Sequence, residues 1–226
     1  MPAWVVAATR ATRTPMIDLY CERTTAGLLA EPWNAASNLA FLVAALAAAR
    51  AGRHAGRLDV LALAGLLALI ALGSAAFHIF ATAWAQWLDV LPIVAFQLAF
   101  LAAYLQRVHG LGKSMTAGVS SAFFLTLLVA AQAPPILNGS LAYVPAAVVL
   151  GWVAWDGWRR TRNSALAVAA VLFPISLAAR TVDLALCPLW PRGTHWAWHL
   201  LNALVLWLVV TGHLRSPRHE SRQSMT

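Results

Sequence analysis

Three histidines have the residue type and the spacing needed to hold a metal ion. His195 and His199 occur in THWAWHLLN, four residues apart, so they share one face of a helix. His78 lies far upstream, at the end of GSAAFH, and is expected at the same depth as the other two. Three imidazoles that leave one position for water are the ligand set of a catalytic zinc site. The alternative is that the three rings only form hydrogen bonds at an interface between water and lipid.

Two further residues could act on a substrate beside such an ion. Ser74 lies four residues before His78, so its hydroxyl could donate to a developing oxyanion on the same helix face. The hydroxyl could equally bond back to a carbonyl of its own helix. Asp89 follows at the start of the next apolar stretch, where its carboxylate could take a proton from an attacking water. Alternatively, Asp89 is a helix N-terminal residue favoured by the helix dipole.

The elements that must position these residues are apolar helices. Of the 226 residues, 61% are hydrophobic and 11% are charged, which is more apolar surface than a soluble domain of this length can bury. A bilayer core about 30 Å thick needs about 20 apolar residues per helix. The apolar runs are continuous, unlike the alternating strands of a membrane barrel. We predict an all-α integral membrane protein, a seven-transmembrane helix bundle with spans at roughly 33–50, 58–79, 87–105, 115–132, 141–157, 164–185 and 195–213.

The basic residues indicate how these spans are oriented. Eleven of the 16 fall on one side of the predicted membrane: Arg50, Arg53, Arg57, Arg107, Lys113, Arg159, Arg160, Arg162, Arg215, Arg218 and Arg222. The other side holds Arg10, Arg13, Arg23 and Arg192, and Arg180 lies within a span. The positive-inside rule therefore places the N-terminus outside and the C-terminus in the cytoplasm. Basic loops beside anionic headgroups explain the net charge of +8 without nucleic acid.

This topology divides the chain into three parts: an extracytoplasmic N-terminal segment (1–32), a transmembrane domain (33–213) and a basic cytoplasmic tail (214–226). Cys21 precedes the first span and Cys187 follows the sixth, so both map to the outer side. Disulfides persist in oxidising, extracytoplasmic space, and we predict a Cys21–Cys187 bridge there. Two free, buried thiols are the alternative. In the sixth span, Arg180 and Asp183 lie three residues apart and are expected to pair.

The chain resembles the alkaline ceramidases and, more broadly, the CREST superfamily of seven-helix membrane hydrolases. The resemblance is carried by YCE at 20–22, AEPWNAASN at 30–38, GSAAFH at 73–78, LDVLP at 88–92 and HWAWH at 195–199. It implies a zinc ion held by His78, His195 and His199. It also implies that Asp89 orients or deprotonates the attacking water and that Ser74 stabilises the oxyanion of an attacked amide.

The same resemblance implies a calcium site in the N-terminal segment. Glu22, Glu31 and the backbone carbonyl of Tyr20 match its ligand positions, and Asp18 and Thr24 stand near where further ligands would be. Together these residues could supply five or six of the six to eight oxygens that calcium takes. The alternative is a solvated acidic lip on the helix bundle.

We therefore expect a zinc-dependent amidohydrolase that cleaves a lipid amide, above all ceramide, into a sphingoid base and a fatty acid. The lipid would enter from the bilayer, and the sequence indicates neither a nucleic-acid partner nor an obligate protein partner. A lipid ester or phospholipid would suit the same site. The composition, rich in Ala and Arg with one lysine, indicates a bacterial inner membrane with the site towards the periplasm. In a eukaryote the membrane would be that of the endoplasmic reticulum or Golgi.

Two other classes of protein remain open at this point. A receptor-like or lipid-binding protein would hold a structural zinc, closed by Asp89 as the fourth ligand. A transporter would carry its polar groups near the midplane, on broken helices.

Overall fold

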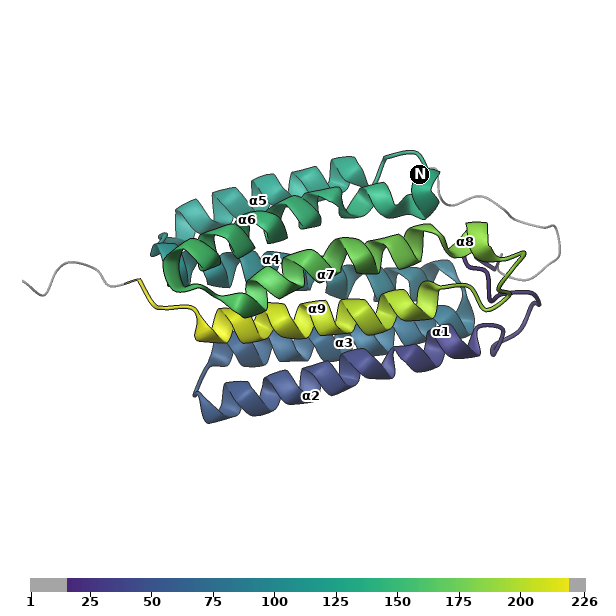
Figure 1. Cartoon of the computed structure of the whole chain (residues 1–226), viewed down its shortest axis with the longest axis horizontal. Coiled ribbons are helices and arrows are strands. Elements are labelled where there is room, and N and C mark those ends of the chain that lie inside the picture. Colours follow the sequence, from purple (N-terminus) through teal and green to yellow (C-terminus); the bar gives the residue numbers. More distant parts are fainter. Residues whose placement is uncertain (1–15, 220–226) are drawn as a thin grey trace, which may run out of the picture.

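The computed structural model describes residues 16–219 and contains no strand in that range. Seven helical segments are long and apolar enough to cross a membrane, which confirms the predicted bundle of seven spans: Pro32–His54, Leu58–Phe80, Ala83–His109, Lys113–Ala130, Ile136–Thr161, Ser164–Thr181 and His195–Arg215. They lie side by side with similar axis directions (Figure 1). Arg10, Arg13 and Arg222, which contributed to the predicted orientation, lie outside the described residues, and that orientation stays a prediction.

Short helices cap one end of this bundle. The individual elements are α1 (Pro32–Ser37), α2 (Leu39–His54), α3 (Leu58–Phe80), α4 (Ala83–His109), α5 (Lys113–Ala130), η1 (Ile136–Tyr143), α6 (Val144–Thr161), α7 (Ser164–Thr181), α8 (Asp183–Leu186) and α9 (His195–Arg215). The short elements α1, η1 and α8 lie at the end opposite to the described C-terminus (Figure 1). We call this end, together with the segment 16–31, the capped end.

α3 and α9 form the centre of the bundle. Half of the residues in their most apolar windows are buried, against a third or less in the other five spans. Large apolar side chains of the outer helices are exposed instead, among them Val43, Val148 and Val171. A surface of this kind is stable only against another apolar phase, which fits a bilayer. Polar side chains on α3 and α9 are therefore shielded from lipid by the surrounding spans.

The turn between α3 and α4 is short because α3 ends abruptly. Ala81 adopts the left-handed conformation with φ 47°, and its amide donates to the carbonyl of Phe77. Only Ala81 and Thr82 separate the two helices. α4 thus begins at Ala83, four residues before the predicted boundary, and Asp89 lies in its second turn rather than at its start. The helix dipole acts within the first turn, so it does not account for this carboxylate.

Gly73 allows α3 and α4 to pack backbone against backbone. A β-carbon built on Gly73 would lie 1.9 Å from the carbonyl oxygen of Leu88, far inside van der Waals contact. No larger residue fits without moving one of the helices. The close approach brings Ser74, the next residue of α3, beside Asp89, the residue after Leu88.

Candidate metal centre

His78, His195 and His199 converge at the capped end of the bundle. His78 comes from the last turns of α3, and the other two come from the first turns of α9. Each offers a ring nitrogen within 4.8 Å of those of the other two, and all three residues are at most 2% exposed. Within residues 16–219 this is the one such group of three or more candidate ligands, and Asp89 does not belong to it. The structure thus brings the three predicted histidines together.

Two of these rings are oriented by oxygens on their Nδ1 side. Nδ1 of His78 lies 2.5 Å from Oε2 of Glu31, and Nδ1 of His199 lies 3.1 Å from the carbonyl of Asn34 and 2.7 Å from Oγ of Ser37. Because carboxylates and carbonyls only accept, each Nδ1 must carry the proton and donate it. In the neutral ring each Nε2 atom is then left with a free lone pair, as in metal sites where outer oxygens fix the histidine tautomer.

The two Nε2 atoms lie 3.3 Å apart. With both protons on Nδ1, no hydrogen joins them, so two lone pairs face each other in a buried place. Zinc–nitrogen bonds of about 2.0–2.1 Å at tetrahedral angles hold two ligand nitrogens about 3.3–3.4 Å apart. The spacing and protonation of His78 and His199 therefore fit one shared cation.

The third ring, His195, is held by stacking and by its backbone. It stacks on the Tyr20 ring, with the ring centroids 3.6 Å apart and an angle of 21° between the ring planes. Its amide donates to Oδ1 of Asp183 at 2.9 Å. Its Nδ1 is buried and has no hydrogen-bond partner among the described residues. A buried polar atom without a hydrogen-bond partner costs free energy, so such atoms are rare. A metal ion bound at this cluster would account for the missing partner of this ring nitrogen.

Ser74 and Asp89 lie next to each other beside the cluster. Ser74 is buried and forms a side-chain hydrogen bond with Asp89, and Asp89 also interacts electrostatically with His78. Asp89 as a whole residue is half-buried. A hydroxyl donor and a carboxylate acceptor thus border the position at which the three histidines converge.

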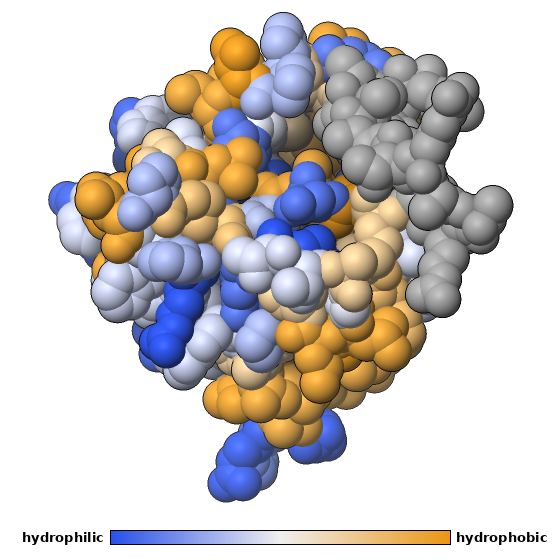
Figure 2. Space-filling view, turned by 90° about the vertical axis from the view of Figure 1, so that its right-hand side faces the viewer, coloured by the Kyte–Doolittle hydropathy of each residue, from blue (hydrophilic) through white to orange (hydrophobic). Residues whose placement is uncertain are grey.

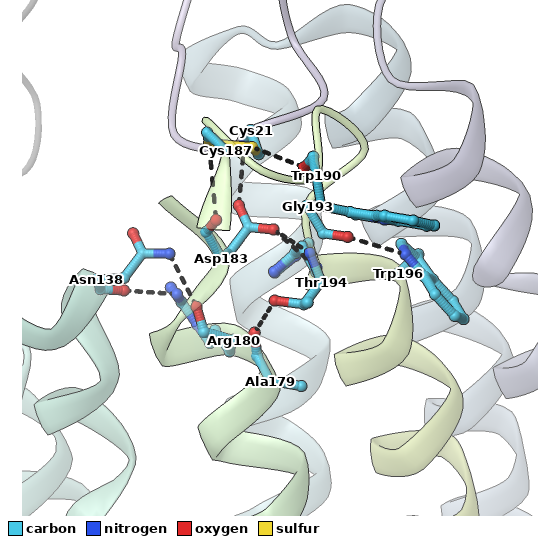
Figure 3. Close-up of a disulfide and its surroundings, with 11 residues drawn as sticks. Cys21, Asn138, Ala179, Arg180, Asp183, Cys187, Trp190, Gly193, Thr194 and Trp196 are labelled. Carbon is cyan, nitrogen blue, oxygen red and sulfur yellow. Dashed lines mark hydrogen bonds between the residues drawn. A yellow bond between two sulfur atoms is a disulfide. The ribbon is translucent and has the colours of Figure 1, made fainter. Parts of the chain in front are cut away.

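The predicted pairing of Arg180 with Asp183 is wrong. α7 ends at Thr181 and Asp183 begins α8, so the two residues do not share one continuous helix face. Asp183 accepts backbone hydrogen bonds from Cys21, Thr194 and His195 (Figure 3). Arg180 instead donates to the carbonyl of Asn138 at 2.6 Å. Asp183 therefore fixes the start of α9, where His195 lies.

The predicted disulfide between Cys21 and Cys187 is confirmed (Figure 3). It joins the N-terminal segment to the loop after α8, beside Asp183. Gly193 in the same loop has φ +60°, and a β-carbon there would lie 2.1 Å from Oδ1 of Asp183 and 2.6 Å from Cβ of Cys21. Glycine is thus required for the backbone to approach both residues.

The five predicted calcium ligands are exposed or take part in other contacts. Both carboxylate oxygens of Glu22 accept backbone N–H groups at the start of α1, and Thr24 is exposed. The carbonyl of Tyr20 accepts the amide of Arg23. Asp18 is exposed and accepts a hydrogen bond from the amide of Tyr20.

Glu31, the fifth of these residues, faces the histidines. Its oxygens accept from Arg23 Nε at 2.6 Å, Asn34 Nδ2 at 3.1 Å and His78. Burial alone would raise the pKa of Glu31, but the hydrogen bond from His78 and the charge of Arg23 outweigh it and lower the pKa. Burial raises the pKa of Glu22, and the two backbone N–H groups only partly counteract it. Glu31 is therefore the ionised carboxylate behind the His78 ring.

Sequence reasoning missed this outer layer of contacts. The sequence pattern predicts calcium binding for Glu31 and only a contribution to the charge distribution for Arg23, and it connects neither residue with His78. One signal was available: Glu31, Asn34 and Ser37 recur every three residues at the start of the first span, so they lie close together on the helix. Polar residues with that spacing in an apolar span indicate a shared partner, which proves to be the histidine cluster.

An apolar cavity lies one helical turn deeper in the bundle. Its lining includes Ile70, Ile93 and Asn202, which lie one turn further into the membrane than Ser74, Asp89 and His199 respectively. Phe96, Phe100, Phe123 and Phe173 supply most of the aromatic surface. At the other side of the site, hydrophilic residues lie recessed near the middle of the capped end (Figure 2). The site thus lies between a polar surface and an apolar interior.

Comparison with known families agrees with this arrangement. A family model described as Ceramidase matches residues 13–225, nearly the whole chain. No curated protein matches the chain.

Proposed function

The chain belongs to the ceramidase family, and on that premise we propose that it is a zinc-dependent intramembrane hydrolase of lipid amides, with ceramide as the expected substrate. The observation that supports zinc binding is the distance of 3.3 Å between two deprotonated Nε2 atoms, those of His78 and His199. Three histidines without a fourth protein ligand leave room for a reacting group, as catalytic zinc sites do.

The chemistry would be shared between the ion and two side chains. A bound zinc ion supplies Lewis acidity, which activates water at neutral pH and polarises a carbonyl. Asp89 accepts the proton of the attacking water and later delivers it to the departing amine nitrogen. The Ser74 hydroxyl donates a hydrogen bond to the oxygen of the attacked carbonyl, where negative charge develops. The amide C–N bond and one O–H bond of water are broken, a C–O bond and an N–H bond are formed, and the products are a fatty acid and a sphingoid base.

The apolar cavity beneath the site suits the acyl chain of such a lipid. It is lined mainly by aromatic and aliphatic side chains and starts one turn below Ser74 and Asp89. An amide at the level of the histidines would then leave its hydrocarbon chain in apolar surroundings. Two amide side chains, Gln97 and Asn202, interrupt this lining, and each has an oxygen without a partner among the described residues.

The competing interpretations fit these contacts less well. A structural zinc would need Asp89 as a fourth ligand, but its carboxylate contacts Ser74 and lies outside the group of three histidines. A transporter would place its polar groups near the midplane; here they lie in the last turns of α3 and the first turns of α9. The charge pattern of the sequence supports an extracytoplasmic location for this end, towards the periplasm in a bacterium.

The experiment that tests the function is hydrolysis of a lipid panel by the purified chain in lipid nanodiscs. The panel pairs ceramides with acyl esters and phospholipids of equal chain length, and fatty acid release is measured by mass spectrometry. Release from ceramide that exceeds release from the matched esters supports the proposal. Release from the esters alone would indicate a lipid esterase, and zinc binding without any release would indicate a binding protein.

A further inference from the structure

Arg23 is a buried cation in the acidic N-terminal segment. Its side chain is 3% exposed. The guanidinium donates from Nε to Oε1 of Glu31 at 2.6 Å, from Nη1 to the carbonyl of Gly27 at 3.3 Å and from Nη2 to the carbonyl of His78 at 3.0 Å. The planar fork of five N–H donors suits several oxygens that converge from different directions. Arg23 thus ties two points of the N-terminal segment to the last turn of α3.

The contacts of Arg23 and its neighbours leave few carboxylate oxygens free to bind a calcium ion. Calcium needs six to eight oxygens, but both oxygens of Glu31 already bind Arg23, Asn34 and His78. Both oxygens of Glu22 bind the backbone of α1. The residues present therefore do not fit calcium, although they include the positions at which the family resemblance implied it.

We propose that Arg23 takes the place of calcium as the cation of the N-terminal segment and is a positioning residue for His78. The second half of this inference rests on one part of the proposed function, that His78 is a zinc ligand, and not on lipid hydrolysis itself. Arg23 reaches His78 twice: directly, through the backbone carbonyl, and indirectly, through Glu31, whose other oxygen holds Nδ1 of the ring. Both the backbone and the tautomer of one ligand are thereby fixed by a single guanidinium.

Charge balance explains why this guanidinium matters. Glu31 is 2% exposed, and an ionised carboxylate in such a place is unstable without a paired, hydrogen-bonded cation. Removing Arg23 leaves this carboxylate without its ion pair, so that it will turn towards other donors. A rotated Glu31 no longer holds Nδ1–H of His78. The expected consequence is weaker zinc binding, by the roughly 10- to 100-fold typical of outer partners of metal-bound histidines.

The first test needs no variant. The purified full chain is equilibrated with calcium chloride alone, bound calcium is measured by equilibrium dialysis, and thermal unfolding is followed by tryptophan fluorescence. The inference predicts no stoichiometric calcium and no change in the unfolding midpoint. One bound calcium per chain together with a raised midpoint would overturn the replacement of calcium by Arg23.

The second test measures zinc affinity by competition with a chromophoric chelator. Arg23→Gln should weaken zinc binding, and Arg23→Lys, which keeps the charge but not the fork, should recover part of the loss. Arg192→Gln is the matched control, because Arg192 is an exposed arginine at the same end, stacked over Trp33 at 4.9 Å. It should bind zinc as the unmodified chain does.

A double-mutant cycle separates positioning from a general loss of folding. If Arg23 acts through Glu31, the effects of Arg23→Gln and Glu31→Gln on zinc affinity should not add. Additive effects, or unchanged zinc affinity in Arg23→Gln, would refute the positioning role. Because calcium and zinc binding are read without substrate, a chain that hydrolyses no lipid would refute the proposed function while leaving this inference intact.

Discussion

The Nε2 atoms of His78 and His199 face each other at 3.3 Å, while the Nδ1 atom of each ring donates to an oxygen on its other side. Glu31 fixes the first ring, and Asn34 with Ser37 fixes the second. All three of these partners come from α1 or the residue before it, while the two histidines come from α3 and α9. The start of the first span thus orients metal-ligand candidates on two other spans.

Asp89→Asn should abolish most turnover while leaving the zinc content unchanged. The amide has nearly the shape of the carboxylate but cannot accept the proton of the attacking water, and a positioned general base contributes about 100- to 10,000-fold. Ceramide hydrolysis and metal analysis on the same preparation provide the two readouts. Wild-type turnover in this variant would remove Asp89 from the mechanism, and loss of zinc would show that it is a ligand.

Gly73→Ala should destabilise the chain and lower its activity. The added methyl group would collide with the carbonyl of Leu88 and push α4, with Asp89, away from Ser74. Overpacking of this kind costs about 1–3 kcal/mol. Gly65→Ala is the matched control on the same helix, where a β-carbon meets nothing within 4 Å. The thermal unfolding midpoint and the turnover should be lower in Gly73→Ala than in Gly65→Ala. Equal midpoints and equal turnover in the two variants would argue against the close contact of α3 with α4.

Cys187→Ser should lower the thermal unfolding midpoint and make it insensitive to reductant. The disulfide joins residues 166 positions apart, and removing a bridge of this type typically costs about 2–5 kcal/mol. The unmodified chain should lose a similar amount of stability when dithiothreitol is added. A midpoint that is the same with and without reductant in the unmodified chain would show that the bridge contributes no stability.

Ala146→Phe should discriminate between long and short acyl chains. Ala146 lines the apolar cavity, so a phenyl ring there would occupy space assigned to the lipid tail. Forcing extra carbons into filled space costs about 1–3 kcal/mol, so long-chain ceramides should be cleaved roughly tenfold more slowly or worse. Short-chain ceramides should be affected less. Val148→Phe, at a 66% exposed position of the same helix, is the control, and an equal loss in both variants would argue against this assignment of the cavity.

The spans and the histidine cluster were predictable because each depends on a local or repeated pattern. Apolar runs of bilayer length specify the spans whatever their partners are. The four-residue spacing places His195 and His199 on one helix face. Burial of His78 beside them needed the additional assumption of equal depth, which the seven-span topology supplied.

The contacts behind the histidines were not predictable in the same way. Arg180 and Asp183 have a spacing that favours pairing, yet the end of α7 at Thr181 breaks the helix between them. Arg23 reaches Glu31 and His78 because the N-terminal segment lies against the end of α3, where the amide of Ile17 donates to the carbonyl of Ala81. Such contacts depend on tertiary placement, and neither charge counting nor periodicity reports it.

The most direct test of the central claim is metal analysis of the purified chain beside His199→Ala. We expect close to one zinc per unmodified chain, strongly reduced zinc in the variant, and loss of ceramide hydrolysis in parallel with the zinc. Unchanged zinc content in His199→Ala, or full hydrolysis by a chain stripped of zinc, would contradict a metal centre built from these three histidines.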